Sequence, residues 1–276
     1  MIKREIKDQY IDLASELKID CDRCSGLCCV ALCFLQTAGF PEDKAGGKPC
    51  MNLMPNYRCK IYSQLAQKGM KGCLAYDCFG AGQKVTQVCC PHSDWRTDPK
   101  QSATIFAVFS IVFQLHQMLW YLIEALSVNT DETVASEIER LIQENQQMTE
   151  QESDKILSLD VEKYKTKVNK VLKKVCRVIA VNPVESQDDK DFLGKDFNKC
   201  NLDGSDFSMS LMIAANFEGC SIRGANFLGT DMRDANIKNA DLRESMFLTQ
   251  MQINSTRGNS NTKLPANLSR PSIWEE

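Results

Sequence analysis

Residues 190–249 read KDFLG KDFNK CNLDG SDFSM SLMIA ANFEG CSIRG ANFLG TDMRD ANIKN ADLRE SMFLT, which makes twelve frames of five residues. The third position of each frame is always apolar, and the second is mostly Asp or Asn. From the third frame onward the first position is small. A period of five fits neither the turn of a helix nor the alternation of a strand. It predicts a chain that turns a corner every five residues, with one large and one small side chain inward at each corner.

These frames resemble the pentapeptide-repeat family, whose fold is a right-handed four-sided β-helix. The resemblance implies that four frames make one coil, so the chain makes about three coils spaced about 4.8 Å apart. Residues twenty apart then stack in apolar columns, one of Phe207, Phe227 and Phe247 and another of Leu202, Ile222 and Leu242. Cys200 and Cys220 fall in the small inward position, where we expect core residues and not metal ligands.

A second unusual stretch lies near the N-terminus, where Cys21-Asp-Arg-Cys24-Ser-Gly-Leu-Cys28-Cys29 places four cysteines within nine residues. Of the 14 cysteines, 11 lie in the first 90 residues. Such a density serves a disulfide framework, a metal site or thiol redox chemistry. Residues 1–20 lack the apolar core and the cleavage site of an export signal. We therefore expect a cytoplasmic, reducing location, in which metal binding outranks disulfides.

The spacing of this stretch is similar to the CxxCxxxCC signature of cysteine-cluster proteins described as zinc- or iron-chelating. Members of that family continue with one cysteine, another before Ile-Tyr and a final pair, and the chain matches this order. The Arg-Pro that usually precedes the last pair is replaced by KGMKG at residues 68–72. The resemblance implies a metal-ligand set of eight thiols: Cys21, Cys24, Cys28, Cys29, Cys50, Cys59, Cys73 and Cys78.

Thiolate is a soft donor that suits zinc and iron–sulfur clusters, and a tetrahedral zinc site takes four ligands. Eight thiols suffice for two four-ligand sites, or for fewer sites with spare thiols. A reduced thiol set without metal and a thiol redox centre are the alternatives. Cys33 is a candidate spare ligand, and Cys89-Cys90-Pro-His92 is a candidate second site. His116 is expected at the edge of the core.

The middle of the chain predicts about three helices. The first covers roughly residues 100–127, and the second follows a cap at Asn129 or Thr130. The third runs from about residues 149–154 to about Ala180. The first helix is mostly apolar, but its polar residues recur along one stripe. We therefore expect a core helix and no membrane span.

The second and third predicted helices carry opposite charge. Residues 131–152 hold seven acids and one base, whereas residues 153–177 hold eight bases and three acids. This opposition predicts that the basic helix packs beside the acidic one. The net charge of the whole chain is −3, so we expect no nucleic-acid partner.

The predicted fold class is α+β and multidomain, in four parts. Residues 1–97 form a cysteine-cluster metal-binding domain, residues 98–183 a helical domain and residues 184–256 the pentapeptide-repeat β-helix. Residues 257–276 form a capping tail anchored by Trp274. A stack of repeats needs its open ends covered, and the tail supplies one cover.

The sequence favours a non-enzymatic protein, because no catalytic or phosphate-binding motif accompanies its two histidines. It would bind zinc or an iron–sulfur cluster through the N-terminal cysteines and a protein partner through the β-helix. One alternative is a redox or group-transfer enzyme that uses an iron–sulfur cluster at the cysteine site. Another, implied by the pentapeptide-repeat resemblance, is a DNA mimic that binds a type II topoisomerase. Residues 188–249 hold eleven acids against seven bases, a mild imbalance for imitating a polyphosphate.

Overall fold

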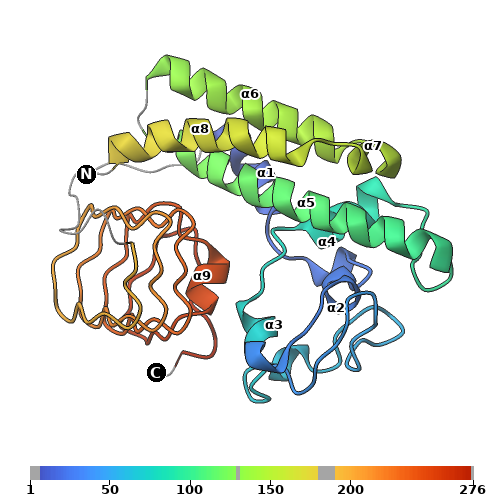
Figure 1. Ribbon diagram of the computed structural model, residues 1–276, viewed down its shortest axis with the longest axis horizontal. Coiled ribbons are helices and arrows are strands. Elements are labelled where there is room, and N and C mark those ends of the chain that lie inside the picture. Colours follow the sequence, from blue (N-terminus) through green and yellow to red (C-terminus); the bar gives the residue numbers. More distant parts are fainter. Residues whose placement is uncertain (1–6, 129–130, 180–189, 275–276) are drawn as a thin grey trace.

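Three structural parts follow one another along the chain in the computed structural model, which describes residues 7–128, 131–179 and 190–274. Figure 1 shows a cysteine-rich part in blue and cyan and a set of longer helices in green and yellow. A stack of coils, in orange and red, lies at the other side of the molecule.

The cysteine-rich part is built from short elements joined by loops. They are η1 (Asp8–Tyr10), α1 (Ile11–Glu16), η2 (Cys21–Arg23), α2 (Leu27–Ala31), η3 (Gln36–Ala38), η4 (Tyr62–Gln64), α3 (Lys71–Ala75), α4 (Ala81–Lys84) and η5 (Val85–Cys89). A buried core that includes Leu27, Val30, Ala81 and Val85 holds α2, α4 and η5 against the first long helix.

The helical part consists of α5 (Pro99–Leu126), α6 (Glu132–Thr149), α7 (Ser153–Leu157) and α8 (Val161–Ile179). α5 begins at a strong cap, because the Asp98 carboxylate accepts a hydrogen bond from the Lys100 N–H at 3.0 Å and a proline follows it. The other three helices all pack against α5. Among the described residues α5 is long and apolar enough to cross a membrane, and 50% of its most apolar window is buried inside the protein.

The helical middle is confirmed, with two differences from the prediction. The third predicted helix is divided into α7 and α8, because the Asp160 carboxylate accepts the Lys163 N–H at 2.9 Å and starts a new helix. α6 is capped by Asp131, whose carboxylate accepts the Val134 N–H at 2.9 Å. The predicted caps, Asn129 and Thr130, lie outside the described residues.

The predicted pairing of the acidic and basic helices is confirmed. Lys167 of α8 lies 2.6 Å from Glu144 of α6, and Lys174 lies 2.5 Å from Glu137. Such partly exposed pairs add little stability individually. Their main effect is to neutralise the facing surfaces of two helices that are already joined by buried apolar contacts.

The repeat region forms coils of twenty residues. Parallel bridges join residues twenty apart, from Asp191–Leu211 to Asn226–Met246. Backbone hydrogen bonds also connect neighbouring coils, for example from the Phe197 N–H to the Asn216 carbonyl at 2.8 Å. Four five-residue frames therefore make one coil, as predicted.

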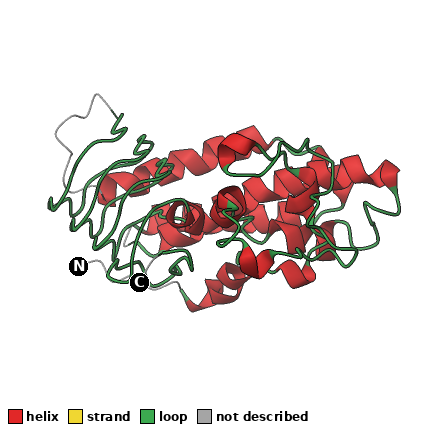
Figure 2. Ribbon diagram, turned by 90° about the horizontal axis from the view of Figure 1, so that it is seen from below, coloured by secondary structure: helices red, strands yellow, loops and turns green. Residues whose placement is uncertain are grey.

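The predicted β-helix is not seen as strands, because the described residues of the stack form isolated bridges and turns (Figure 2). The reason lies in the fifth position of the frames. Eleven consecutive frames have a positive φ there: Gly194, Lys199, Gly204, Met209, Ala214, Gly219, Gly224, Gly229, Asp234, Asn239 and Glu244. A left-handed residue at every fifth position turns the chain, so each face of a coil contributes a single bridged residue.

The apolar columns follow the prediction except at Phe247. The rings of Phe207 and Phe227 lie 5.5 Å apart inside the stack. Phe247 instead has a φ of 57°, and its ring lies 6.0 Å from that of Tyr121 on α5. Leu248 is buried in the stack core in its place. The prediction is wrong for Phe247 because the left-handed position moves from the fifth to the third residue of that frame, which turns the ring toward the helices.

The two cysteines of the stack differ in burial. Cys220 is 1% exposed, and its thiol donates to the Phe197 carbonyl at 2.8 Å, as expected of a core residue. Cys200 is exposed, contrary to the prediction. It lies in the first coil, and no preceding coil in the described part of the chain covers it.

The residues after the stack close its last coil. α9 (Gln250–Asn254) starts at a capping box formed by Thr249 and Gln252, and Arg257 then bridges to Asn236. The Trp274 indole N–H donates to the Thr256 carbonyl at 3.2 Å, and its ring covers Gly258. Trp274 is only 8% exposed and joins the core of the stack.

Candidate metal centre

The eight candidate ligands carry free thiols and come from the loops and short helices of the cysteine-rich part. Cys28 and Cys29 lie on α2, and their sulfur atoms are 3.9 Å apart. Cys21 begins η2 and Cys73 lies on α3. Cys78 is buried and Cys21 is exposed, while the other six are half-buried.

Cys24 and Cys78 meet at Gly82 of α4. A Cβ added at Gly82 would lie 2.6 Å from the Cys24 sulfur and 4.0 Å from the Cys78 sulfur, so only glycine leaves both thiols this space. Burial raises the pKa of the Cys78 and Cys24 thiols, and nearby backbone N–H groups oppose this rise, that of Gly82 at Cys78 and those of Leu27 and Gly26 at Cys24. Backbone donors of this kind stabilise thiolates, as they do around iron–sulfur clusters.

A second gathering of thiols contains Cys29, Cys50, Cys59 and Cys73. The Cys50 N–H donates to the Cys29 carbonyl at 2.9 Å, and the Asn52 N–H donates to the Cys50 sulfur at 3.4 Å. Cys59 and Cys73 pack against one small apolar cluster, which consists of Ile61, Leu65 and Met70.

Arg58 holds the loop that carries the first two cysteines. Its guanidinium donates to the carbonyls of Cys21, Asp22 and Cys24. It also pairs with the Asp22 carboxylate at 2.9 Å. Because Arg58 directly precedes Cys59, this contact ties the Cys21–Cys24 loop to the segment that carries a third candidate ligand.

Lys44 holds the segment around the end of α2 in a similar way. Its ammonium donates to four carbonyls, those of Val30, Leu32, Ala45 and Lys48. Burial lowers the pKa of Lys44, while the charges of the Cys50 and Cys29 thiolates act in the opposite direction. A positive charge therefore lies beside the second gathering of thiols.

Burial raises the pKa of the Cys21 and Cys73 thiols to about 12 and that of Cys78 to about 11. Neighbouring thiolates add to the shift of Cys21 and Cys73. Within the adjacent pair the Cys28 thiol donates to Cys29, which raises the pKa of Cys28 and lowers that of Cys29. A bound metal ion would lower the pKa of the thiols that coordinate it, because its positive charge displaces the thiol protons.

Tyr76 supplies a test of whether a metal or cluster fits here. Its hydroxyl is buried and has no hydrogen-bond partner among the described residues; burial raises the pKa of Tyr76, and thiolate charge at Cys28 or Cys78 raises it further. A metal-bound thiolate or a cluster sulfide would accept this orphan donor. The soft donors, the Gly82 cradle and the hydroxyl therefore fit a thiolate-bound metal. Within the described ranges, no three His, Cys, Asp or Glu side chains are placed to hold a metal ion.

The other candidates from the sequence differ in their surroundings. Cys33 and His92 are exposed, and the charge of Cys33 acts on Lys44. Cys89 and Cys90 are buried in the core, where the Cys89 thiol donates to the Thr149 carbonyl at 3.4 Å. The structure thus does not bring Cys89, Cys90 and His92 together as a second site in the part of the chain it describes.

Three residues of the centre were not predicted from the sequence: Lys44, Arg58 and Tyr76. Arg58 lies one residue before Cys59, and Tyr76 lies two residues before Cys78. This closeness in sequence to candidate ligands was the signal that could have identified them. Lys44 lies six residues from the nearest candidate cysteine, Cys50, and no motif marks it.

Comparison with known proteins shows to which family this chain belongs. A profile of pentapeptide repeats, in eight copies, matches residues 210–247. The uncharacterized protein YybG of Bacillus subtilis (strain 168) is 46% identical over 266 residues, which cover 94% of this chain and 95% of YybG. The chain belongs to the same family as YybG, and its residues 210–247 are pentapeptide repeats. Its similarity to YybG extends through all three structural parts of this pentapeptide-repeat protein.

Solved structures match about a quarter of this chain. The pentapeptide-repeat protein Rfr23 from the cyanobacterium Cyanothece 51142 is 23% identical over 25% of this chain and 46% of that chain, with a TM-score of 0.22. Full-length QnrB1, a plasmid-mediated fluoroquinolone resistance protein, is 26% identical over 27% of this chain and 34% of that chain, with a TM-score of 0.24. This pentapeptide-repeat protein thus spans less than half the length of the structures it matches.

Proposed function

We propose that this is a cytoplasmic, non-enzymatic protein whose N-terminal thiols bind zinc or an iron–sulfur cluster and whose coil stack binds a protein partner. In this proposal the N-terminal part is a cysteine-cluster domain, and the stack is a short right-handed four-sided β-helix. The metal half rests on the eight free thiols of the cysteine-rich part and on the orphan Tyr76 hydroxyl near Cys28, Cys78 and Cys24.

Elemental analysis of the full chain, purified without oxygen, tests the metal half. We expect stoichiometric zinc or iron, and with iron a visible absorbance that bleaches on reduction. A colourless zinc protein argues against the alternative of an iron–sulfur enzyme. Cys200→Ser, which changes an exposed thiol of the stack, should keep the full metal content. A chain without stoichiometric metal overturns this half of the proposal.

The partner-binding half rests on an apolar patch of the stack. Most frames have Asp or Asn at the second position, but Leu211 occupies it and is 48% exposed. Leu193 on the neighbouring coil and Met209 at the preceding corner are 63% and 69% exposed. Met246, another apolar residue at the second position, is 1% exposed because it packs into the core of the helical part. By this comparison an apolar second position occurs where another surface covers the stack.

Crosslinking in cells, followed by mass spectrometry, tests this surface. Leu211→Asn should lose the partner that the unaltered chain captures. Leu157→Asn changes an apolar residue of α7 that is 39% exposed and should keep that partner. Equal capture by the unaltered chain and Leu211→Asn contradicts this half.

The charges of the stack favour this proposal over the topoisomerase alternative. Arg223 pairs with Glu244, Arg233 with Asp231 and Arg243 with Asp241, each at 2.6 Å. These pairs neutralise carboxylates that a DNA mimic would display to its target. DNA supercoiling by a type II topoisomerase should therefore be unchanged at a large molar excess of the protein.

A further inference from the structure

The backbone of the Cys21–Cys24 loop is held by side chains from distant parts of the chain. Every carbonyl from Cys21 to Ser25 accepts a hydrogen bond from one of them. Arg58 donates to the carbonyls of Cys21, Asp22 and Cys24, Gln87 donates to that of Arg23 at 3.0 Å, and the Trp95 indole donates to that of Ser25 at 2.9 Å. Backbone groups of a surface loop can bond to water instead. Side-chain donors for all of these carbonyls therefore indicate a loop held in one conformation.

One face of α4 and η5 carries three polar side chains that bond to this loop or its flanks: Gln83, Thr86 and Gln87. Residues three and four apart share a face of a helix, which allows all three to reach the same segment. Gln83 is 8% exposed and binds the chain just before the loop. Its Oε1 accepts the Asp20 N–H at 3.2 Å, and its Nε2 donates to the Lys18 carbonyl at 2.6 Å.

Thr86 binds the other side of the loop. Its hydroxyl donates to the Gly82 carbonyl at 2.9 Å and accepts the Ser25 N–H at 3.0 Å. Its single proton is then used, so the Ser25 hydroxyl, 3.1 Å away, is the donor between the two hydroxyls. Burial raises the pKa of the Cys24 thiol, and Thr86 is among the groups that oppose this rise. Thr86 thus acts on the loop backbone and on one of the loop thiols.

The segment that binds the loop also contacts its thiol directly and has an unusual backbone. Gly82 of α4 leaves the space that the Cys24 sulfur occupies. η5 is a π-helix, closed by a hydrogen bond from the Cys90 N–H to the Val85 carbonyl at 2.9 Å. Single π-turns are rare and are frequent at functional sites. Both Thr86 and Gln87 lie within this turn.

We infer that Gln83, Thr86 and Gln87 are positioning residues, which act through the backbone of the Cys21–Cys24 loop to place its two thiols for metal binding. All three lie outside the cysteine motif, so they extend the candidate centre to α4 and η5. This inference rests on the proposed metal function and adds the residues that orient the ligands. Replacing outer residues of this kind weakens metal binding, because a loop that is held in advance loses less conformational entropy when it binds.

The first measurement is the alkylation rate of each cysteine in the metal-free full chain, followed by mass spectrometry. Gln87→Met removes the donor to the Arg23 carbonyl, and Gln87 is exposed, so the core stays intact. The rates of the two loop thiols should rise by roughly fivefold, as expected for the loss of one hydrogen bond. The rates of Cys50 and Cys73, outside the loop, should not change. Gln114→Met, which removes a side-chain hydrogen bond within α5, should leave all four rates unchanged.

The second measurement is the affinity for Zn²⁺, determined by competition with a chelator. Gln87→Met and Thr86→Val should each weaken binding by roughly fivefold, because each removes hydrogen bonds to the loop. Thr86→Ser keeps the hydroxyl and should bind Zn²⁺ as the unaltered chain does. Rescue by serine distinguishes the hydrogen bonds of Thr86 from the packing of its methyl group.

The outcomes separate this inference from the proposed function. Equal alkylation of the loop thiols in Gln87→Met and the unaltered chain overturns the inference. A parallel rise at every cysteine also overturns it, because that result indicates general destabilisation. Unchanged Zn²⁺ affinity in both Gln87→Met and Thr86→Val overturns the positioning role and keeps the metal function. No bound Zn²⁺ in the unaltered chain overturns the metal function and, with it, positioning for metal, whatever the alkylation rates show about the loop.

Discussion

At the scale of one residue, burial favours the neutral form of the His116 side chain. It is 4% exposed, and its Nδ1 lies 2.7 Å from the Phe79 carbonyl. Burial lowers the pKa of His116 to about 4; the hydrogen bond to Phe79 opposes this shift and the charge of Lys84 adds to it. The sequence placed His116 only at the edge of the core, because helical periodicity does not reveal that a residue 37 positions away supplies its partner.

The pH dependence of unfolding follows from this burial. Between about pH 6.5 and pH 4 the unfolded chain binds a proton at His116 that the folded chain does not. The free energy of unfolding is therefore highest, with respect to His116, above about pH 6.5. It decreases by about 3 kcal/mol as the pH falls from there to about 4. Urea unfolding at several pH values measures this loss. His116→Gln should flatten the dependence, whereas the exposed control His92→Gln should not, and equal slopes for the two variants contradict the assignment.

At the scale of the element, Leu211 interrupts a ladder of polar side chains on the stack. In the neighbouring column the Asn216 amide donates to Asp196 at 2.9 Å and accepts from Asn236 at 2.9 Å. Leu211→Asn places the same amide opposite Asp191, so we expect stability to rise or stay equal, within about 1 kcal/mol. Asn216→Leu, the reverse exchange, should lower it by about 1 kcal/mol or more. Thermal unfolding compares the two, and a clear loss in Leu211→Asn would mean that Leu211 stabilises the stack itself.

Features that depend on residues close together in sequence were predictable, whereas features that depend on contacts between distant residues were not. The twenty-residue coil was predictable because every frame repeats the same local pattern. The predicted apolar column was wrong at Phe247, where contact with Tyr121 overrides that pattern. The candidate ligands were predictable from their spacing. The positions of Gly82 and Lys44 beside these thiols were not, because both residues approach the thiols only in the folded chain.

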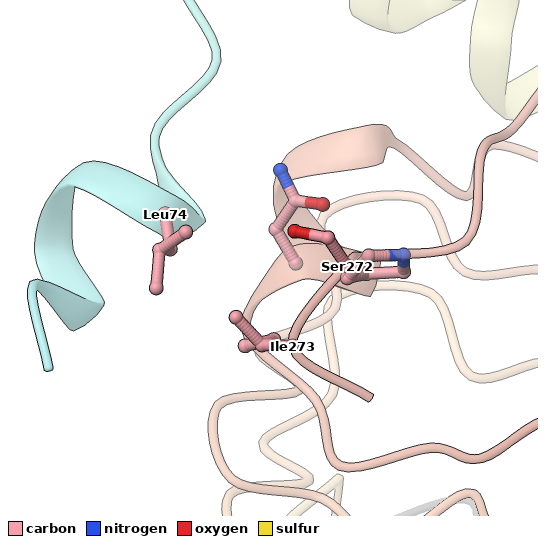
Figure 3. A pocket seen from close by; sticks show the side chains of 5 residues that line it. Leu74, Ser272 and Ile273 are labelled. Carbon is pink, nitrogen blue, oxygen red and sulfur yellow. The ribbon is translucent and has the colours of Figure 1, made fainter. Parts of the chain in front are cut away.

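At the scale of the whole molecule, the cysteine-rich part touches the closed end of the stack through α3. Leu74 lines a cavity of ≈ 160 Å³ together with Asn254, Pro271, Ser272 and Ile273. Figure 3 shows Leu74 on one side of this space and Ser272 and Ile273 on the other. α3 also contacts α9. Because Leu74 directly follows the candidate ligand Cys73, the candidate metal centre and the end cap of the stack share one short helix.

If the cysteine-rich part binds metal as proposed, this contact predicts that the bound metal stabilises the end cap of the stack. Leu74→Asp places a charge against Ile273 and should speed amide hydrogen exchange in residues 271–274 by roughly fivefold, equivalent to about 1 kcal/mol of lost apolar contact. Leu157→Asp, a change at an exposed leucine of α7, should leave this exchange unchanged. Removing metal from the unaltered chain should act in the same direction as Leu74→Asp, because Cys73 then no longer fixes α3. Removing it from Leu74→Asp should add little, since the contact is already broken. Independent, additive effects of the two changes would show that metal removal reaches the cap by a route other than α3.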